Sequence, residues 1–185
     1  YSYDNKYILS ATLRRDGSSK FLTYRWGVFP AASVGWRVSQ ENFMEDVSWV
    51  SDLRLSFGYG VVGNQLNVDP NNPYTLFGVQ DGSYYALNGS TIRSGFAQSS
   101  IGNPDARWEK NINGNIGVNA SLFGGRLNVT AEYYWKDVRD LLYNPLLLAT
   151  AGAAAPPFVN IANMRNQGVD ASVSTQGDLG GGLRD

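Results

Sequence analysis

Aromatic and amide side chains are interspersed along residues 62–106, and this combination could bind a sugar. Aromatic rings stack on the apolar faces of sugars, while amides and carboxylates form oriented hydrogen bonds with hydroxyl groups. The candidate ligand-binding residues are Tyr74, Phe77, Tyr84 and Tyr85. The polar residues among them are Asn71, Asn72, Asp81, Asn88 and Gln98, and Phe96 supplies a further ring. The alternative is that these rings pack within the segment or against a partner protein.

A second segment, residues 145–159, is unusually apolar for a connection between regular elements. Exposed apolar patches of this size often mark an interface. We expect either a partner protein or a neighbouring loop to cover it, with lipid contact as a lesser alternative. The candidate partner-contact residues are Leu146, Leu147, Leu148 and Phe158.

Several kinds of chemistry are excluded because the chain contains no histidine and no cysteine. Zinc, haem and iron–sulfur sites lose their usual ligands, and Ser–His–Asp or Cys–His catalysis lacks its base. No two of the 16 acidic residues stand out as an acid–base couple. We therefore expect no enzymatic activity, no metal and no cofactor. The net charge of −1 also argues against a nucleic-acid partner.

The elements that would position these segments alternate between apolar and polar residues. In residues 107–122, six of the eight even positions are apolar and none of the odd positions is. A helix cannot keep that separation, because its period is 3.6 rather than 2. The same alternation predicts six antiparallel strands, at residues 7–14, 28–38, 53–61, 107–122, 127–136 and 169–175. The long connections 15–27, 62–106 and 143–163 then gather at one end of the sheet.

Two all-β architectures produce this alternation: a soluble β-sandwich and an outer-membrane β-barrel. The longest predicted strands exceed the five or six residues usual in globular proteins, but they suit a tilted membrane crossing. Ring-bearing residues fall towards strand ends, as in an interfacial girdle. The opposite face is rich in Asn, Ser and Gly, whereas the outer face of a sandwich usually carries more Lys and Glu. The pattern therefore favours the barrel.

Six strands cannot close a membrane barrel, because known examples begin at about eight. An open edge in lipid would leave unpaired backbone groups, at several kcal/mol each. If the sheet is a barrel, we expect these 185 residues to form one arc of it. Both ends of the chain look like cuts through a longer protein.

Ordered motifs along the chain resemble those of the SusC/RagA family of TonB-dependent outer-membrane transporters. The family hairpin resembles residues 4–7 and 14–21, DNKY and RRDGSSKF. Further matching motifs are FPAASVGWR at 29–37, ENFM at 41–44, SDLRL at 51–55, GVVGNQ at 60–65, NPD at 103–105, WEK at 108–110, RL at 126–127, YY at 133–134, DLL at 140–142, NI at 160–161 and MRNQGV at 164–169. Their shared order makes the resemblance specific over nearly the whole chain.

The resemblance implies a 22-stranded barrel in the outer membrane with a plug inside it. Residues 1–185 would then be part of the barrel domain, with the plug and the remaining strands outside them. It also implies energy from the TonB complex, contact with outer-membrane lipid, and a SusD-like surface lipoprotein as partner. The implied substrate is an oligosaccharide or a peptide.

The sequence is also compatible with two other functions. A SusC-like barrel could act as a non-transporting structural subunit of an outer-membrane assembly. A soluble β-sandwich that binds carbohydrate is the third hypothesis, and it predicts a chain that folds in water without detergent.

Overall fold

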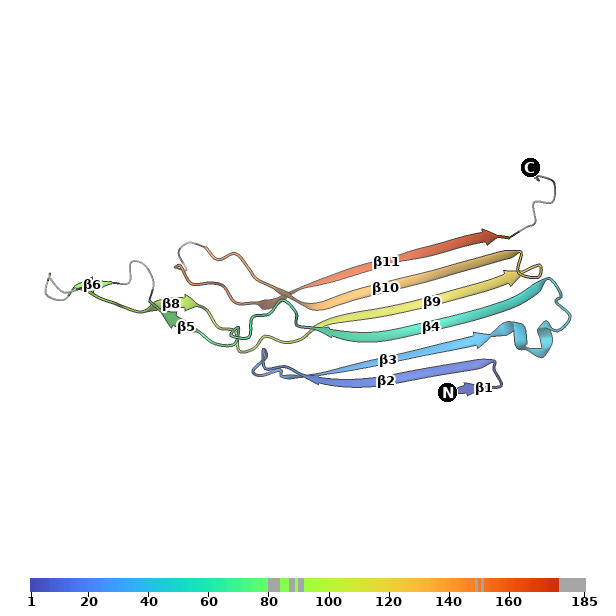
Figure 1. The fold of residues 1–185 in the computed structure, drawn as a ribbon, viewed down its shortest axis with the longest axis horizontal. Helices are drawn as coiled ribbons and strands as arrows, with labels where there is room; N and C mark the ends of the chain where they lie inside the picture. Colours follow the sequence, from blue (N-terminus) through green and yellow to red (C-terminus); the bar gives the residue numbers. More distant parts are fainter. Residues whose placement is uncertain (80–83, 87–88, 90–91, 149, 151, 177–185) are drawn as a thin grey trace, which may run out of the picture.

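Seven strands of this chain form one antiparallel sheet, in the order β1-β2-β3-β4-β9-β10-β11 (Figure 1). The computed structural model describes all residues except 80–83, 87–88, 90–91, 149, 151 and 177–185. The sheet strands are β1 (Ser2–Tyr3), β2 (Tyr7–Gly17), β3 (Trp26–Arg37), β4 (Val50–Asn64), β9 (Glu109–Leu122), β10 (Leu127–Tyr143) and β11 (Val159–Thr175).

The remaining elements lie in the connections. Two short 3-10 helices, η1 (Val38–Gln40) and η2 (Asn42–Met44), lie between β3 and β4. The connection from β4 to β9 contains two small antiparallel ribbons. Their strands are β5 (Leu76–Gly78) paired with β8 (Ala97–Ser100), and β6 (Tyr85–Ala86) paired with β7 (Ile92–Arg93). No helix among the described residues is long and apolar enough to cross a bilayer.

All six predicted strands are present, and their antiparallel pairing is confirmed. Five of them, β2, β3, β4, β10 and β11, continue further towards the long connections than the alternation predicted. Backbone pairing there does not need an apolar face, so the period-2 signal ends before the strand does. The seventh strand, β1, was not predicted. It folds back on β2 through Asp4 and Asn5, whose φ values of 48° and 50° are ones that Asp and Asn tolerate.

The register aligns side chains of one kind across six strands. One row contains only apolar residues: Leu9, Val34, Phe57, Ile116, Tyr133 and Val169. The adjacent row on the opposite side of the sheet is small or polar: Ser10, Ser33, Gly58, Asn115, Tyr134 and Gly168. We call these two sides the apolar face and the polar face.

The apolar face is not the inside of a sandwich. Its central row is exposed, from 41% at Tyr133 to 69% at Val169, and within the described residues no second sheet packs on it. The sheet does not close, because β1 and β11 each have one side without a strand partner in the described part of the chain. An exposed apolar face and two open edges are what one arc of a barrel presents.

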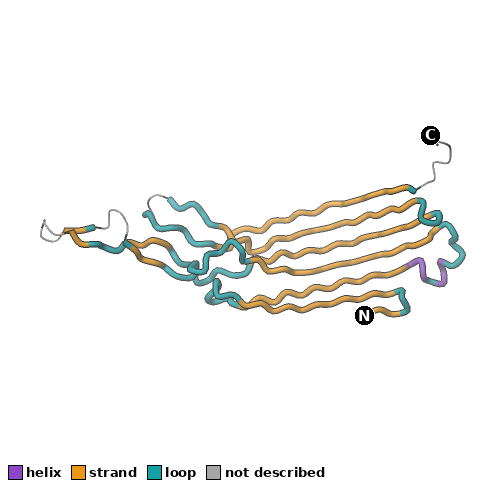
Figure 2. The backbone as a smooth tube through the Cα atoms, in the orientation of Figure 1, coloured by secondary structure: helices purple, strands orange, loops and turns teal. Residues whose placement is uncertain are grey.

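The connections separate by length between the two ends of the sheet, as predicted. Figure 2 shows the loops and ribbons of residues 65–108 and 144–158 extending from one end. The opposite end carries the helical connection and the tight turn at residues 123–126 (Figure 2). We call these the long-loop end and the short-turn end.

One carboxylate, that of Glu41, connects several segments at the short-turn end. Glu41, between η1 and η2, accepts hydrogen bonds from the Tyr7 hydroxyl (2.6 Å) and the Trp36 indole N–H (2.9 Å). The Lys6 ammonium lies 3.5 Å from its other oxygen. The Tyr7 hydrogen bond, followed by that from Trp36, holds the pKa of Glu41 below its ordinary range. The helical connection is thereby fastened to β2 and β3.

We expect Glu41 to make the stability of the short-turn end depend on pH. A carboxyl group whose folded pKa is lowered stabilises fully above its unfolded pKa, which is about 4.3 for Glu. That stabilisation disappears as the pH falls through the folded pKa. In urea unfolding of the intact polypeptide, the gap between wild type and E41Q should be constant at neutral pH and shrink in strong acid. A gap that is the same at every pH would contradict this assignment.

Gly114 leaves space for an indole ring. A Cβ at Gly114 would lie 2.1 Å from the ring of Trp135, its partner across the β9–β10 pair. We expect G114A to lower the free energy of unfolding by about 1–3 kcal/mol, the usual cost of overpacking. Trp135 fluorescence should shift at the same time. The matched control is G35A, whose Cβ would meet only the Ile8 Cβ at 3.6 Å. Equal effects of the two substitutions would disprove the steric explanation.

Candidate functional site

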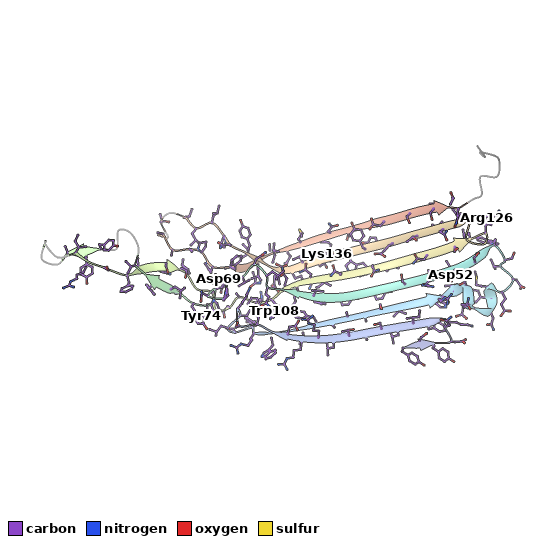
Figure 3. All side chains as sticks on the ribbon, viewed as in Figure 1. Asp52, Asp69, Tyr74, Trp108, Arg126 and Lys136 are labelled. Carbon is purple, nitrogen blue, oxygen red and sulfur yellow. The ribbon has the colours of Figure 1, made fainter. Side chains whose placement is uncertain are left out.

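The long-loop end rests on a small apolar cluster rather than on the sheet face. Its buried members are Phe21, Phe29, Val68, Ala106, Trp108 and Leu142, with Val61 and Phe158 packed against them. The Trp108 ring lies 5.3 Å from that of Phe21 and 5.4 Å, edge-on, from that of Phe29. Its indole N–H donates to the Arg25 carbonyl (3.1 Å). Figure 3 places Trp108 where the loops meet the sheet, so the cluster is the base of the loop region.

Two asparagines join the two longest loops. The Asn72 amide donates to the Phe158 carbonyl (3.3 Å), and its oxygen accepts from the Phe158 N–H (2.7 Å). The Asn103 amide donates to the same carbonyl (2.9 Å). Asn72 and Phe158 are 86 residues apart, so these hydrogen bonds fix the 65–108 loop against the 144–158 loop.

A third asparagine, Asn160, connects the start of β11 to the residues around it. Its side-chain amide donates to the carbonyls of Arg107 (2.9 Å) and Asp140 (2.7 Å). Its oxygen accepts from the Arg107 N–H (2.9 Å). The Arg107 guanidinium also lies 3.1 Å from the Asp140 carboxylate. Asp140 has a φ of 55° beside an irregularity in the β10–β11 register, and these contacts hold it there.

Glu109 is a buried carboxylate at the first position of β9. It accepts hydrogen bonds from the side-chain amides of Asn64 (3.0 Å) and Asn111 (3.2 Å) and from the Leu142 N–H (3.2 Å). These donors belong to β4, β9 and β10. Three donors satisfy a charge that burial would otherwise make costly. Glu109 therefore joins three strands where they leave the sheet.

The candidate ligand-binding residues project beyond this base. Tyr74 precedes β5, Phe77 lies in β5, Tyr84 immediately precedes β6 and Tyr85 lies in β6. All four are exposed, from 49% for Tyr85 to 66% for Phe77. The structure distributes them along the ribbons instead of gathering them in one pocket. Two of their polar neighbours, Asp81 and Asn88, lie outside the described residues.

A cleft of about 320 Å³ lies between the two long loops. Its polar lining consists of Asp69, Asn71, Asn72, Ser100 and Asn144, and its apolar lining includes Leu76, Ile101, Ala155, Pro156, Pro157 and Phe158. Figure 3 labels Asp69, which lines this cleft, near the foot of the ribbons. Within the described residues, no group of three or more acidic side chains is placed to hold a metal ion.

The candidate partner-contact residues occupy two different environments. Leu146 and Leu148 are almost fully exposed, at 95% and 79%, and Leu147 is 39% exposed. Phe158 packs against the apolar cluster, and its backbone is held by Asn72 and Asn103. The three leucines therefore form the exposed apolar surface, while Phe158 supports the base.

Some of the residues that build this base were quoted from the sequence only as parts of motifs. Asn64, Asn103 and Asn160 each lie in one of the matching motifs, yet none was selected as a functional candidate. Glu109 also lies in a motif, and its place on the polar face of its strand predicts a structural ion pair with the plug. Their sequence positions did not show that they converge. Apart from hydrogen bonds to residues two positions away, their side-chain contacts join residues at least 20 positions apart.

Comparison with known proteins identifies relatives over almost the whole chain. Residues 1–184 match the family described as TonB dependent receptor-like, beta-barrel. The chain is 36% identical over 177 residues to TonB-dependent receptor P39 of Formosa agariphila, covering 95% of the chain and 16% of that relative. It is 30% identical to TonB-dependent receptor SusC of Bacteroides thetaiotaomicron, covering 95% of the chain and 18% of SusC.

A solved structure has the same fold. The structure of the RagAB peptide transporter superposes with a TM-score of 0.81 at 28% identity, over 97% of this chain and 19% of that one. The chain thus spans less than a fifth of the length of each of these relatives.

Replacing Glu109 should loosen the base of the loops. In E109Q the side chain keeps its shape, but one acceptor oxygen becomes a donor that faces other donors. We expect a loss of about 1–3 kcal/mol in the free energy of unfolding and faster proteolysis of the long loops. The matched control is E132Q on β10, since Glu132 is only partly buried and its carboxylate makes no hydrogen bond or ion pair within the described structure. Equal protease sensitivity of the two variants would contradict this role.

Proposed function

Because the chain belongs to the TonB-dependent receptor-like β-barrel family, we propose that it forms one arc of an outer-membrane importer for oligosaccharides or peptides. The observation that carries the proposal is the exposed apolar face of an antiparallel sheet with two open edges. In a bilayer, further strands must pair with β1 and β11, since lipid cannot satisfy their backbone groups. The apolar face would then contact lipid, and the polar face would line the barrel interior.

The long-loop end would face the outside of the cell. Outer-membrane barrels have short turns on the periplasmic side and longer loops on the extracellular side. This orientation places the aromatic ribbons where cargo arrives. The RagAB structure, described as a peptide transporter, supports peptide as one cargo class, and the exposed rings suit stacking on sugars as well.

We propose two protein partners for the importer. A SusD-like surface lipoprotein would contact the exposed leucines of the 144–158 loop, with Phe158 supporting that loop from below. The TonB complex would supply energy through a region outside these residues. The similarity to SusC and to the RagAB transporter supports both partners.

Uptake by living cells tests the proposed transport. Cells that lack the intact polypeptide should lose import of its oligosaccharide or peptide cargo, and restoring it should restore import. Dissipating the proton gradient should abolish import, because transport through TonB is energised. An intact barrel in the outer membrane that imports neither class of cargo would overturn transport and favour a structural subunit.

The aromatic ribbons should contribute to cargo capture. Replacing Tyr74, Phe77, Tyr84 and Tyr85 together by Ala should weaken cargo binding by about tenfold or more, because each ring stack contributes roughly 0.5–1.5 kcal/mol. The measurement is the concentration of labelled oligosaccharides or peptides that half-saturates uptake. The control is F43A/F123A, which removes two exposed rings at the short-turn end. Unchanged half-saturation with loss of the co-purifying lipoprotein would assign the rings to partner contact instead.

A further inference from the structure

Charged side chains interrupt the apolar face at its long-loop end. Asp137 pairs across the sheet with Ile112 on β9 and with Arg165 on β11, so it lies on the same side as the apolar rows. Two residues further on, Arg139 pairs with Lys110 on β9. We call these four residues, Lys110, Asp137, Arg139 and Arg165, the outer basic cluster.

The outer basic cluster begins where a membrane crossing would end. On β10 the apolar face runs from Leu127 to Trp135, which is nine residues, and Asp137 is the next position on that face. A tilted strand crosses the hydrocarbon core in about 9–11 residues. In the barrel of the proposed function, on which this inference rests, the cluster therefore lies at headgroup level on the extracellular side.

The cluster carries more positive than negative charge. Arg165 forms a bidentate pair with Asp137, at 2.5 and 2.7 Å. This uses two of the five guanidinium N–H groups and leaves three for another acceptor. The nearby Asp140 carboxylate is engaged by Arg107 at 3.1 Å. Three cations and one carboxylate leave an excess of two positive charges.

Lys110 and Arg139 are like charges at paired positions on neighbouring strands. Both are exposed, and neither forms an ion pair within the part of the chain that the structure describes. Like charges directly opposite on neighbouring strands are destabilising. An anionic group from outside the chain would remove that repulsion, and the position at the edge of the apolar face limits which anion can reach it.

A shallow cleft of about 330 Å³ opens at the same place. It is lined by Asp137, Val138, Arg139, Asn163, Met164 and Arg165. Two guanidinium groups beside a cleft suit a phosphate, because their N–H groups match its oxygens in geometry. Below the cleft, Tyr133, Trp135 and Ile112 continue the apolar face on which acyl chains would lie.

We propose that the outer basic cluster binds the phosphate of a lipid headgroup in the outer leaflet of the membrane. The cations neutralise the phosphate, and the apolar rows below them hold the acyl chains of the same molecule. The commitment is to a phosphorylated lipid rather than to free phosphate, since the cluster is continuous with the lipid-facing surface.

The test uses the intact polypeptide in phosphatidylcholine nanodiscs doped with monophosphoryl lipid A or with its dephosphorylated form. Retention of each lipid A after washing is measured by native mass spectrometry. Wild type should retain the phosphorylated form preferentially. K110A/R139A should weaken that retention by roughly tenfold or more, because each cation near an anionic lipid contributes roughly fivefold. This double variant leaves the Asp137–Arg165 pair in place.

The control variant is R126A/K136A, which also removes two cations. Lys136 is adjacent to Asp137 on β10 but lies on the polar face, and Arg126 lies in the turn at the short-turn end (Figure 3). This control variant should retain as much phosphorylated lipid A as wild type does. Heat-modifiable gel migration verifies that each barrel is closed, and K110Q/R139Q replaces the alanine variant if that one does not fold.

Equal retention of the two lipids by wild type would overturn the proposal, as would equal retention of the phosphorylated lipid by wild type and K110A/R139A. Displacement of the lipid by inorganic phosphate alone would overturn the proposal of a lipid ligand and indicate that the cluster binds a free anion. Cargo uptake is measured on the same variants. Failure of uptake with the lipid preference intact would contradict the transport function and leave this inference standing.

Discussion

The continuous backbone ladder from β1 to β11 is the constraint on which the rest of the structure depends. β10, which has 17 residues, pairs with β9 on one side and β11 on the other, and this pairing satisfies most of its N–H and C=O groups. That pairing fixes one register for the whole sheet, and the register sorts apolar and polar side chains into opposite rows. It also confines every irregular segment to the two ends.

The two ends of the sheet use different contacts to support the segments that connect the strands. At the short-turn end, the Glu41 carboxylate accepts hydrogen bonds from Tyr7 and Trp36 and pairs with Lys6. These contacts hold the short connection between β3 and β4 against the sheet. At the long-loop end, many residues must be ordered without a sheet beneath them. An apolar cluster around Trp108, together with asparagine amides and the Glu109 carboxylate, provides the support. The motif residues at that end thus have a structural role, while the aromatic residues of the ribbons stay exposed.

On β10 the apolar face ends where charged residues begin. Tyr133 and Trp135 lie directly below the charged residues that begin at Asp137. Rings followed by cations match the order of acyl chain and headgroup in a membrane. In the proposed barrel, the same strand would contact lipid, place charges at headgroup level and support the loops, in that order along its length.

Sequence alternation predicted an all-β antiparallel sheet, its six strands and the end at which the long connections gather, because period-2 alternation is a local property of each strand. It favoured a barrel over a sandwich, and the ordered motifs indicated the barrel family. The aromatic candidates Tyr74, Phe77, Tyr84 and Tyr85 were also visible, because their types and spacing suffice to nominate them. The three-dimensional arrangement was needed to show that β11 begins at Val159, that Phe158 lies apart from the leucines, and that Asn72 and Asn103 meet at the Phe158 backbone. It was also needed to show that Glu109 accepts from the Leu142 N–H. Most of those contacts join residues far apart in the chain. Their partners become known only when the register and the loop path are fixed together.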